Sequence, residues 1–214
     1  MPDYSILKQM KGAIFDLDGV IVDTAKYHYL AWRSLASELG FDFTEADNER
    51  LKGVSRIRSL DILLDIGGLE FTEAEKLAMA ERKNRLYVNY ISELEESELL
   101  PGVRAYLNRL RGGGTGIALG SASKNALFIL DKLNIAGMFD AVVDGNKVSR
   151  AKPDPEVFLT AAQELGLQPG ECVVFEDAEA GIAAGKAAGM QVVGIGRAEV
   201  LGEADIVVSG LHEL

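Results

Sequence analysis

The chain is poor in the residues that form disulfides and metal–thiolate sites. It has one cysteine, Cys172, and two histidines among 214 residues. A single cysteine excludes a disulfide within the chain and a cysteine-rich zinc site. This usage is typical of a reducing compartment, so we expect a cytoplasmic protein. Residues 1–11 lack the apolar core of a signal peptide, and no apolar run approaches the ~20 residues that span a membrane.

Positive charge is also scarce. The chain has 22 lysines and arginines against 33 aspartates and glutamates, a formal net charge of −11. Nucleic acids and anionic membranes carry phosphate charge that such a surface repels, so we expect neither as a partner. Hydrophobic residues make up 48% of the chain, which indicates a folded protein with a sizeable core. An anionic small molecule would need the few cations to be placed locally.

Short apolar runs along the chain predict buried β-strands. They do not alternate with polar residues, which is typical of a parallel sheet covered on both faces. The runs are residues 12–15, 116–119, 141–143, 172–175, 191–195 and 206–208. Helical patterns lie between them, at residues 103–111, 124–134, 155–166 and 179–189. Alternating strands and helices predict an α/β fold with a doubly wound parallel sheet.

The segment after the first strand departs from this alternation, because it contains helical patterns only. The predicted helices are residues 24–40, 44–52, 56–66 and 72–90. An ordinary connection between sheet elements is much shorter. We therefore predict a helical cap domain over residues 24–99, inserted into an α/β core domain formed by residues 1–23 and 100–214.

The sequence from Asp16 to Gly19 directly follows the first predicted strand and is the sharpest motif in the chain. An Asp-Gly pair can also be a simple turn. A calcium loop of the EF-hand type is excluded, because Val20 and Tyr27 stand where oxygen ligands are needed. A dinucleotide site is disfavoured, because no Gly-x-Gly-x-x-Gly pattern follows the strand.

Further polar residues follow other predicted strands. The carboxyl ends of parallel strands lie on one edge of a sheet, so these side chains should converge there. The set is Asp16, Asp18, Ser121, Lys152, Glu176 and Asp177. Carboxylate oxygens suit Mg²⁺, while a serine, a lysine and a helix start suit phosphate oxygens. One carboxylate could then attack phosphorus while its neighbour moves a proton.

This combination of motifs resembles the haloacid dehalogenase superfamily of phosphotransferases, over nearly the whole chain. The resemblance implies that Asp16 is the nucleophile and that Asp18 is the general acid/base. It implies that Ser121 and Lys152 hold the transferring phosphoryl group. The implied Mg²⁺ ligands are Asp16, Asp18 (through its backbone carbonyl), Glu176 and Asp177.

Four segments of the chain look more specifically like the β-phosphoglucomutase family: residues 23–32, 51–56, 82–84 and 122–125. That resemblance implies a monomer that interconverts β-D-glucose 1-phosphate and 6-phosphate through β-glucose 1,6-bisphosphate. His28 and Thr24 would then assist catalysis. The implied substrate-binding residues are Trp32, Lys52, Gly53, Val54, Arg56, Ser59, Lys83, Ala122, Ser123, Lys124 and Asn125.

The residues by themselves leave other interpretations open. His28 and Trp32 share an inward helix stripe, so packing also accounts for both. Arg56 could be a solvated charge at a helix start, and Lys83 could belong to a solvated basic face with its arginine neighbours. The alternative functions are a Mg²⁺-dependent sugar-phosphate phosphatase of the same superfamily and a non-catalytic phosphate-binding protein. Gly120 stands where the superfamily usually has alanine.

Overall fold

The computed structural model describes residues 5–51 and 54–214, so the expected substrate residues Lys52 and Gly53 lie outside the described part. The chain forms two compact units. One unit contains the residues up to Asp23 together with Glu95–Leu214, and the other is Thr24–Leu94. No helix in the described ranges is both long enough and apolar enough to cross a membrane.

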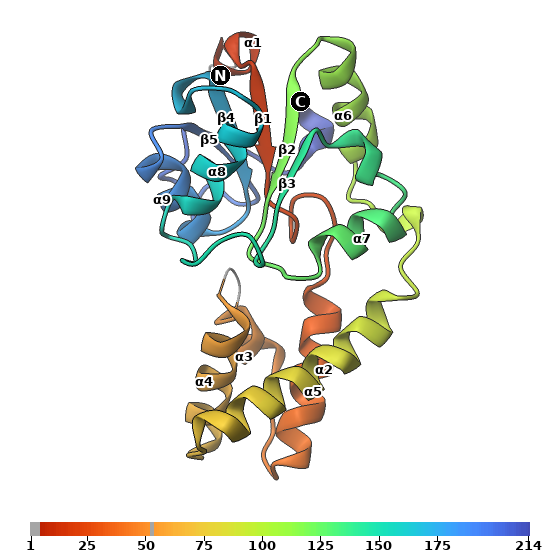
Figure 1. The fold of residues 1–214 in the computed structure, drawn as a ribbon, viewed down its shortest axis with the longest axis vertical. Helices are drawn as coiled ribbons and strands as arrows, with labels where there is room; N and C mark the ends of the chain where they lie inside the picture. The colour runs from red at the N-terminus through yellow and green to blue at the C-terminus, as the bar shows by residue number, and fades with distance from the viewer. Residues whose placement is uncertain (1–4, 52–53) are drawn as a thin grey trace. The chain divides into compact units, whose positions relative to one another are not determined.

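The first unit is built on a six-stranded sheet (Figure 1). Every neighbouring pair of strands is parallel, and the order is β3-β2-β1-β4-β5-β6. The strands are β1 (Gly12–Phe15), β2 (Gly116–Gly120), β3 (Ala141–Val143), β4 (Cys172–Glu176), β5 (Gln191–Ile195) and β6 (Ile206–Val208). The predicted parallel sheet is confirmed, and β1 lies between β2 and β4 as its central partner.

Helices cover both faces of this sheet (Figure 1). They are α6 (Val103–Gly112), α8 (Glu156–Glu164) and α9 (Glu179–Ala187). Helices α8 and α9 pack on the face that carries Ile14 and Val174. The rings of Phe15 and Phe175 stack on the opposite face, 4.5 Å between centroids, and Tyr106 of α6 meets both edge-on. Each strand is apolar on both faces for this reason, as its sequence indicates.

Shorter elements complete the first unit. These are α1 (Ser5–Gln9), α7 (Ala126–Lys132) and the 3₁₀ turns η1 (Glu96–Glu98), η2 (Ala136–Met138), η3 (Pro169–Glu171) and η4 (Leu211–Glu213). Helix α1 has no buried residue and was not predicted. Helix α7 begins two residues later than the expected start at residue 124 and ends two residues earlier.

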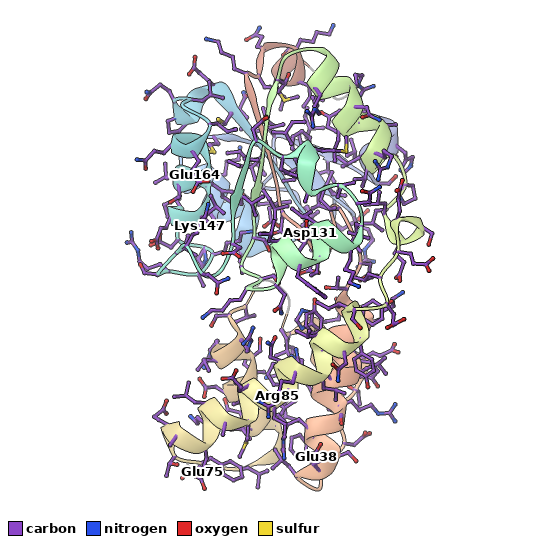
Figure 2. The ribbon with its side chains drawn as sticks, turned by 45° about the vertical axis from the view of Figure 1, so that its right-hand side comes forward. Glu38, Glu75, Arg85, Asp131, Lys147 and Glu164 are labelled. Carbon is purple, nitrogen blue, oxygen red and sulfur yellow. The ribbon has the colours of Figure 1, made fainter. Side chains whose placement is uncertain are left out.

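The described residues of the second unit form four helices: α2 (Ala25–Glu38), α3 (Glu45–Glu49), α4 (Arg56–Gly67) and α5 (Glu73–Ile91). Its own core includes Trp32, Phe43 and Leu63. Thr72 caps α5, because its hydroxyl accepts from the Glu75 amide while the Glu75 carboxylate accepts from the Thr72 amide. Figure 2 labels Glu75 at this helix start.

Candidate active site

The register of the sheet brings two acidic side chains together at the carboxyl ends of its central strands. Phe15 of β1 pairs with Phe175 of β4, and the Asp16 amide donates to the Phe175 carbonyl at 2.9 Å. Asp16 and Glu176 are therefore the next residues of adjacent strands. Side chains alternate along a strand, so both belong to the face that α8 covers. Their juxtaposition follows from strand pairing alone.

The ammonium of Lys152 lies between these carboxylates. Its Nζ donates to Asp16 Oδ1 at 2.5 Å, to Glu176 Oε1 at 2.6 Å and to the Gly120 carbonyl at 3.0 Å. The Lys152 side chain is 3% exposed, and those of Asp16 and Glu176 are 11% and 2% exposed. An ammonium has three protons, and each has an acceptor here. The carboxyl ends of β1, β2 and β4 thus meet at one nitrogen.

Electrostatics keep Lys152 charged in this buried position. Burial disfavours the ammonium, but the Asp16 and Glu176 carboxylates outweigh it and raise the pKa of Lys152 above its ordinary value. Burial and the nearby Asp16 raise the pKa of Glu176, although Lys152 opposes that shift. Two carboxylates face one ammonium, so the three ionised groups carry an excess of negative charge that a further cation would compensate.

An aromatic ring completes the surroundings of Lys152. Phe158 of α8 is fully buried, and its ring centroid is 4.8 Å from Lys152 Nζ. A Cβ on Gly120 would lie 2.9 Å from this ring and 3.2 Å from Ile14 Cγ2. Gly120 therefore lets the Phe158 ring approach the strand end.

The loop after β2 presents a serine on the same edge of the sheet. The Ser121 amide donates to the Val143 carbonyl at 3.0 Å, which extends the β2–β3 ladder by one residue. The Ser121 hydroxyl accepts from the Ser123 amide at 3.1 Å, and the Ser123 hydroxyl accepts from the Asn125 amide at 3.2 Å. A hydroxyl that accepts can still donate, so Ser121 can bind an anionic oxygen.

Asp177 lies against the loop that follows β1. Gly19 has φ +78°, and a Cβ built on it would overlap the Asp177 carboxylate. Only glycine permits this approach together with this backbone. Asp16, Asp18 and Asp177 therefore belong to two loops that touch, and their carboxylate and carbonyl oxygens are the donors that Mg²⁺ prefers. The donor set fits that ion.

Glu176, an expected metal ligand, has hydrogen bonds to both of its oxygens, and its role toward a metal stays a prediction. One of its oxygens accepts from Lys152 and the other from the Ala178 amide at 2.9 Å. Both oxygens are engaged, because the side chain is turned toward Lys152. Within the described residues, no three His, Cys, Asp or Glu side chains form a cluster that could hold a metal ion.

In the second unit, helices α2 and α5 bring several predicted residues together. Lys83 Nζ is 2.7 Å from His28 Nδ1 and stands 4.3 Å from the centroid of the Trp32 ring. The His28 ring stacks on Tyr87 at 4.0 Å, and the Tyr87 hydroxyl donates to Thr24 Oγ1 at 3.1 Å. Lys83 is 4% exposed, so the solvated-face interpretation is wrong for it.

Burial, together with the Lys83 contact, sets the protonation of His28. Burial lowers the pKa of His28 well below its ordinary value, and the charges of Lys83 and Arg56 lower it further. His28 is therefore neutral at pH 7. An ammonium only donates, so Nδ1 accepts and the imidazole proton is on Nε2.

The remaining predicted residues of this unit lie on or before α4. Arg56 is the first residue of α4, half-buried, and burial lowers the pKa of its guanidinium while Glu81 opposes the shift. Ser59 is buried one turn further on, and Val54 is partly exposed. Arg56 is thus less solvated than a free surface charge.

Comparison with known proteins places this geometry in a family. The haloacid dehalogenase-like hydrolases match residues 10–189, which include all six polar residues at the strand ends. The chain belongs to the haloacid dehalogenase-like hydrolase family. In this member, the carboxyl edge of the parallel sheet carries the cluster of Asp16, Lys152 and Glu176.

Three relatives of this haloacid dehalogenase-like protein bear on its function. A β-phosphoglucomutase from Bacillus subtilis is 47% identical over 96% of this chain and 92% of the relative. The crystal structure of a β-phosphoglucomutase from Clostridium difficile has a TM-score of 0.92 and 45% identity, covering 96% of this chain and 93% of that one. A phosphorylated carbohydrates phosphatase from Thermotoga maritima is 33% identical over 85% of this chain and 83% of the relative.

Sequence patterns did not predict two residues that lie at these sites, Phe158 beside Lys152 and Tyr87 beside His28. Phe158 is one apolar residue among several in its helix, and nothing in the sequence separates it from ordinary core. Tyr87 lies four residues after Lys83, so the two share a helix face. That spacing is a signal that could have joined Tyr87 to the predicted set.

Proposed function

We propose that this chain is a β-phosphoglucomutase, an enzyme that interconverts β-D-glucose 1-phosphate and β-D-glucose 6-phosphate. The observation that carries the proposal is the buried bridge from Lys152 to Asp16 and Glu176, in a chain 47% identical to a β-phosphoglucomutase over nearly its whole length. Its substrate is therefore a small phosphorylated sugar.

Asp16 forms the covalent intermediate in this proposal. Lys152 binds Oδ1, so Oδ2 is the oxygen that attacks phosphorus. In one half-reaction the C6 hydroxyl of β-glucose 1-phosphate attacks the aspartyl-phosphate and gives its proton to Asp18, which forms β-glucose 1,6-bisphosphate and frees Asp16. The bisphosphate must then turn round. In the other half-reaction Asp16 attacks the C1 phosphorus, the bond to the C1 sugar oxygen breaks, and that oxygen takes the proton from Asp18, which releases glucose 6-phosphate and restores the aspartyl-phosphate.

Asp16, the Asp18 backbone carbonyl, Glu176 and Asp177 would hold a Mg²⁺ ion at this site. The ion would supply the positive charge that the excess of carboxylates leaves uncompensated. Glu176 also accepts from Lys152 and thereby orients the ammonium. Ser121 and Lys152 bind the oxygens of the transferring phosphoryl group.

The mutase needs a second phosphate site, because its bisphosphate intermediate carries two phosphates and Ser121 and Lys152 are assigned to the transferring one. We assign the second phosphate to Arg56, whose planar guanidinium binds phosphate through two parallel hydrogen bonds. Ser123, Lys124 and Asn125 bind the sugar or the same phosphate. His28 is a further catalytic residue in this proposal, and its neutral state allows Nε2–H to donate.

The second candidate is a sugar-phosphate phosphatase, in which water attacks the aspartyl-phosphate. The Thermotoga maritima relative favours it, although the likeness is weaker: 33% against 47% identity. A phosphatase has no need of a second phosphate anchor, which is the chemical distinction between the two activities.

Phosphorus NMR separates the two activities directly. The purified protein is incubated with Mg²⁺, β-glucose 1-phosphate and a trace of the 1,6-bisphosphate. The mutase converts substrate to glucose 6-phosphate with little free phosphate. Stoichiometric release of inorganic phosphate would instead establish the phosphatase. In the same assay Arg56→Ala should impair the mutase far more than hydrolysis of 4-nitrophenyl phosphate, which carries a single phosphate.

A further inference from the structure

A turn after β3 contacts the loop after β2, and neither the sequence patterns nor the proposed chemistry involves it. The turn is Asp144–Gly145–Asn146, and the loop runs from Ser121 to Asn125. The two strands are neighbours in the sheet, so their following loops leave the same edge together.

Glycine at position 145 permits the closest part of this contact. The Gly145 amide donates to the Ser123 carbonyl at 3.2 Å. A Cβ built on Gly145 would overlap the Ala122 carbonyl oxygen and would lie 3.1 Å from Lys124 Cγ. Any side chain at this position would therefore push the loop away from the turn.

Asn146 ties the turn to the loop through its side chain. Its Nδ2 donates to the Lys124 carbonyl at 3.1 Å and to Asp144 Oδ2 at 2.9 Å. The Asn146 amide donates to Asp144 Oδ1 at 2.9 Å. The Asp144 carboxylate thus holds the asparagine by two hydrogen bonds and aims its remaining amide proton at the loop.

We propose that Gly145 and Asn146 are positioning residues, which hold residues 122–125 in the conformation that binds the sugar or the second phosphate of the substrate. Ser121 is held separately, by the Val143 carbonyl at the end of the sheet. The turn therefore governs recognition of the non-reacting part of the substrate, while the sheet governs the transferring phosphoryl group. The inference rests on the proposed function for the identity of that substrate.

The test compares two substrates in Asn146→Ala, Gly145→Ala and the control Lys147→Ala. Lys147 is adjacent in sequence, but its side chain pairs with Glu164 at 2.8 Å (Figure 2). One assay follows formation of glucose 6-phosphate from β-glucose 1-phosphate, and the other follows hydrolysis of 4-nitrophenyl phosphate. Asn146 is exposed, so its alanine variant should fold normally.

Asn146→Ala should lower kcat/KM for the sugar phosphate about fourfold, the size expected for one neutral hydrogen bond, and leave the aryl phosphate unchanged. Gly145→Ala should lower kcat/KM for the sugar phosphate further. Lys147→Ala should leave kcat/KM unchanged for both substrates. The proposal would be overturned if kcat/KM fell equally for both substrates. It would also be overturned if Asn146→Ala had the same kcat/KM for the sugar phosphate as Lys147→Ala.

Hydrogen exchange of the Ser123 and Asn125 amides gives a readout that does not depend on the reaction. Both amides should exchange faster in Asn146→Ala than in Lys147→Ala, because the loop loses its tie to the turn. Unchanged exchange would overturn the positioning role. If the wild-type protein hydrolysed the aryl phosphate without converting the sugar phosphate, the proposed function would be overturned instead. Hydrogen exchange would still show whether the turn positions residues 122–125.

Discussion

Replacing Lys152 with methionine tests the electrostatics of the site. Methionine keeps an unbranched side chain but removes the ammonium that bridges Asp16 and Glu176 at 2.5 and 2.6 Å. Those two side chains are only 11% and 2% exposed, so water cannot replace the lost cation. Breaking a buried pair on one side costs about 3–5 kcal/mol. At about 2–4 °C per kcal/mol for a chain of this size, the melting temperature should fall by roughly 10 °C.

The loss should also depend on pH. The pKa of Glu176 is already raised, by burial first and then by Asp16, while Lys152 opposes the shift. Removing Lys152 raises this pKa further. A carboxyl whose folded pKa exceeds its unfolded value contributes stability below the unfolded pKa and loses that contribution as pH rises through the folded pKa. Lys152→Met should therefore lose more stability near pH 8 than near pH 5.

Thermal and urea unfolding at the two pH values measure this effect. The control is Lys147→Met, which breaks an ion pair whose side chains are 47% and 34% exposed and should cost at most about 1 kcal/mol. Adding Glu176→Gln to Lys152→Met should restore part of the loss, because one buried charge disappears. A loss below about 1 kcal/mol for Lys152→Met, or one that is equal at both pH values, would refute the reasoning.

Three further predictions follow from other contacts. The free energy of unfolding of the wild type should decrease as pH drops below about 6.5, because the pKa of His28 is lower in the folded protein and the unfolded chain therefore binds the imidazole proton first. Lys83→Met should raise the pKa of His28 toward its ordinary value and reduce this loss of stability. Histidine NMR titration measures the pKa, and urea unfolding at several pH values measures the stability. Gly120→Ala should cost about 1–3 kcal/mol through overlap with Phe158, and Phe158→Leu in that background should recover part of it in thermal unfolding; no loss in the single variant would show that the ring moves freely. Asp16→Asn should abolish both glucose 6-phosphate formation and aryl phosphate hydrolysis, and residual turnover of either would reject Asp16 as nucleophile.

The sheet was predictable because its strands are buried on both faces and read as uninterrupted apolar runs. Strands β2 and β4 extend one residue beyond those runs, to Gly120 and Glu176. Neither residue is apolar, yet both remain in the ladder. Helix α7 starts later than its pattern indicates, because the Ser123 hydroxyl binds the Asn125 amide and prolongs the loop. Local side-chain hydrogen bonds of this kind are invisible to periodicity.

The strand-end cluster was predictable for a topological reason, since parallel strands deliver their carboxyl ends to one edge. What the sequence could not show is how each polar group is used. For Glu176, an expected metal ligand, the sequence did not indicate the hydrogen bonds that its two oxygens accept from Lys152 and the Ala178 amide. Lys83 sits between two arginines in sequence, and only the packing of α5 on α2 shows that it is buried against His28. Such pairings join distant segments, so local pattern does not contain them.

The position of the phosphoryl group on the enzyme tests the central claim most directly. The protein is mixed with Mg²⁺ and β-glucose 1,6-bisphosphate, quenched in acid and mapped by peptide mass spectrometry. We expect one phosphoryl group on Asp16, which a chase with β-glucose 1-phosphate removes to the sugar without releasing free phosphate. A phosphoryl group on another residue, or one that leaves as free phosphate during the chase, would contradict the account.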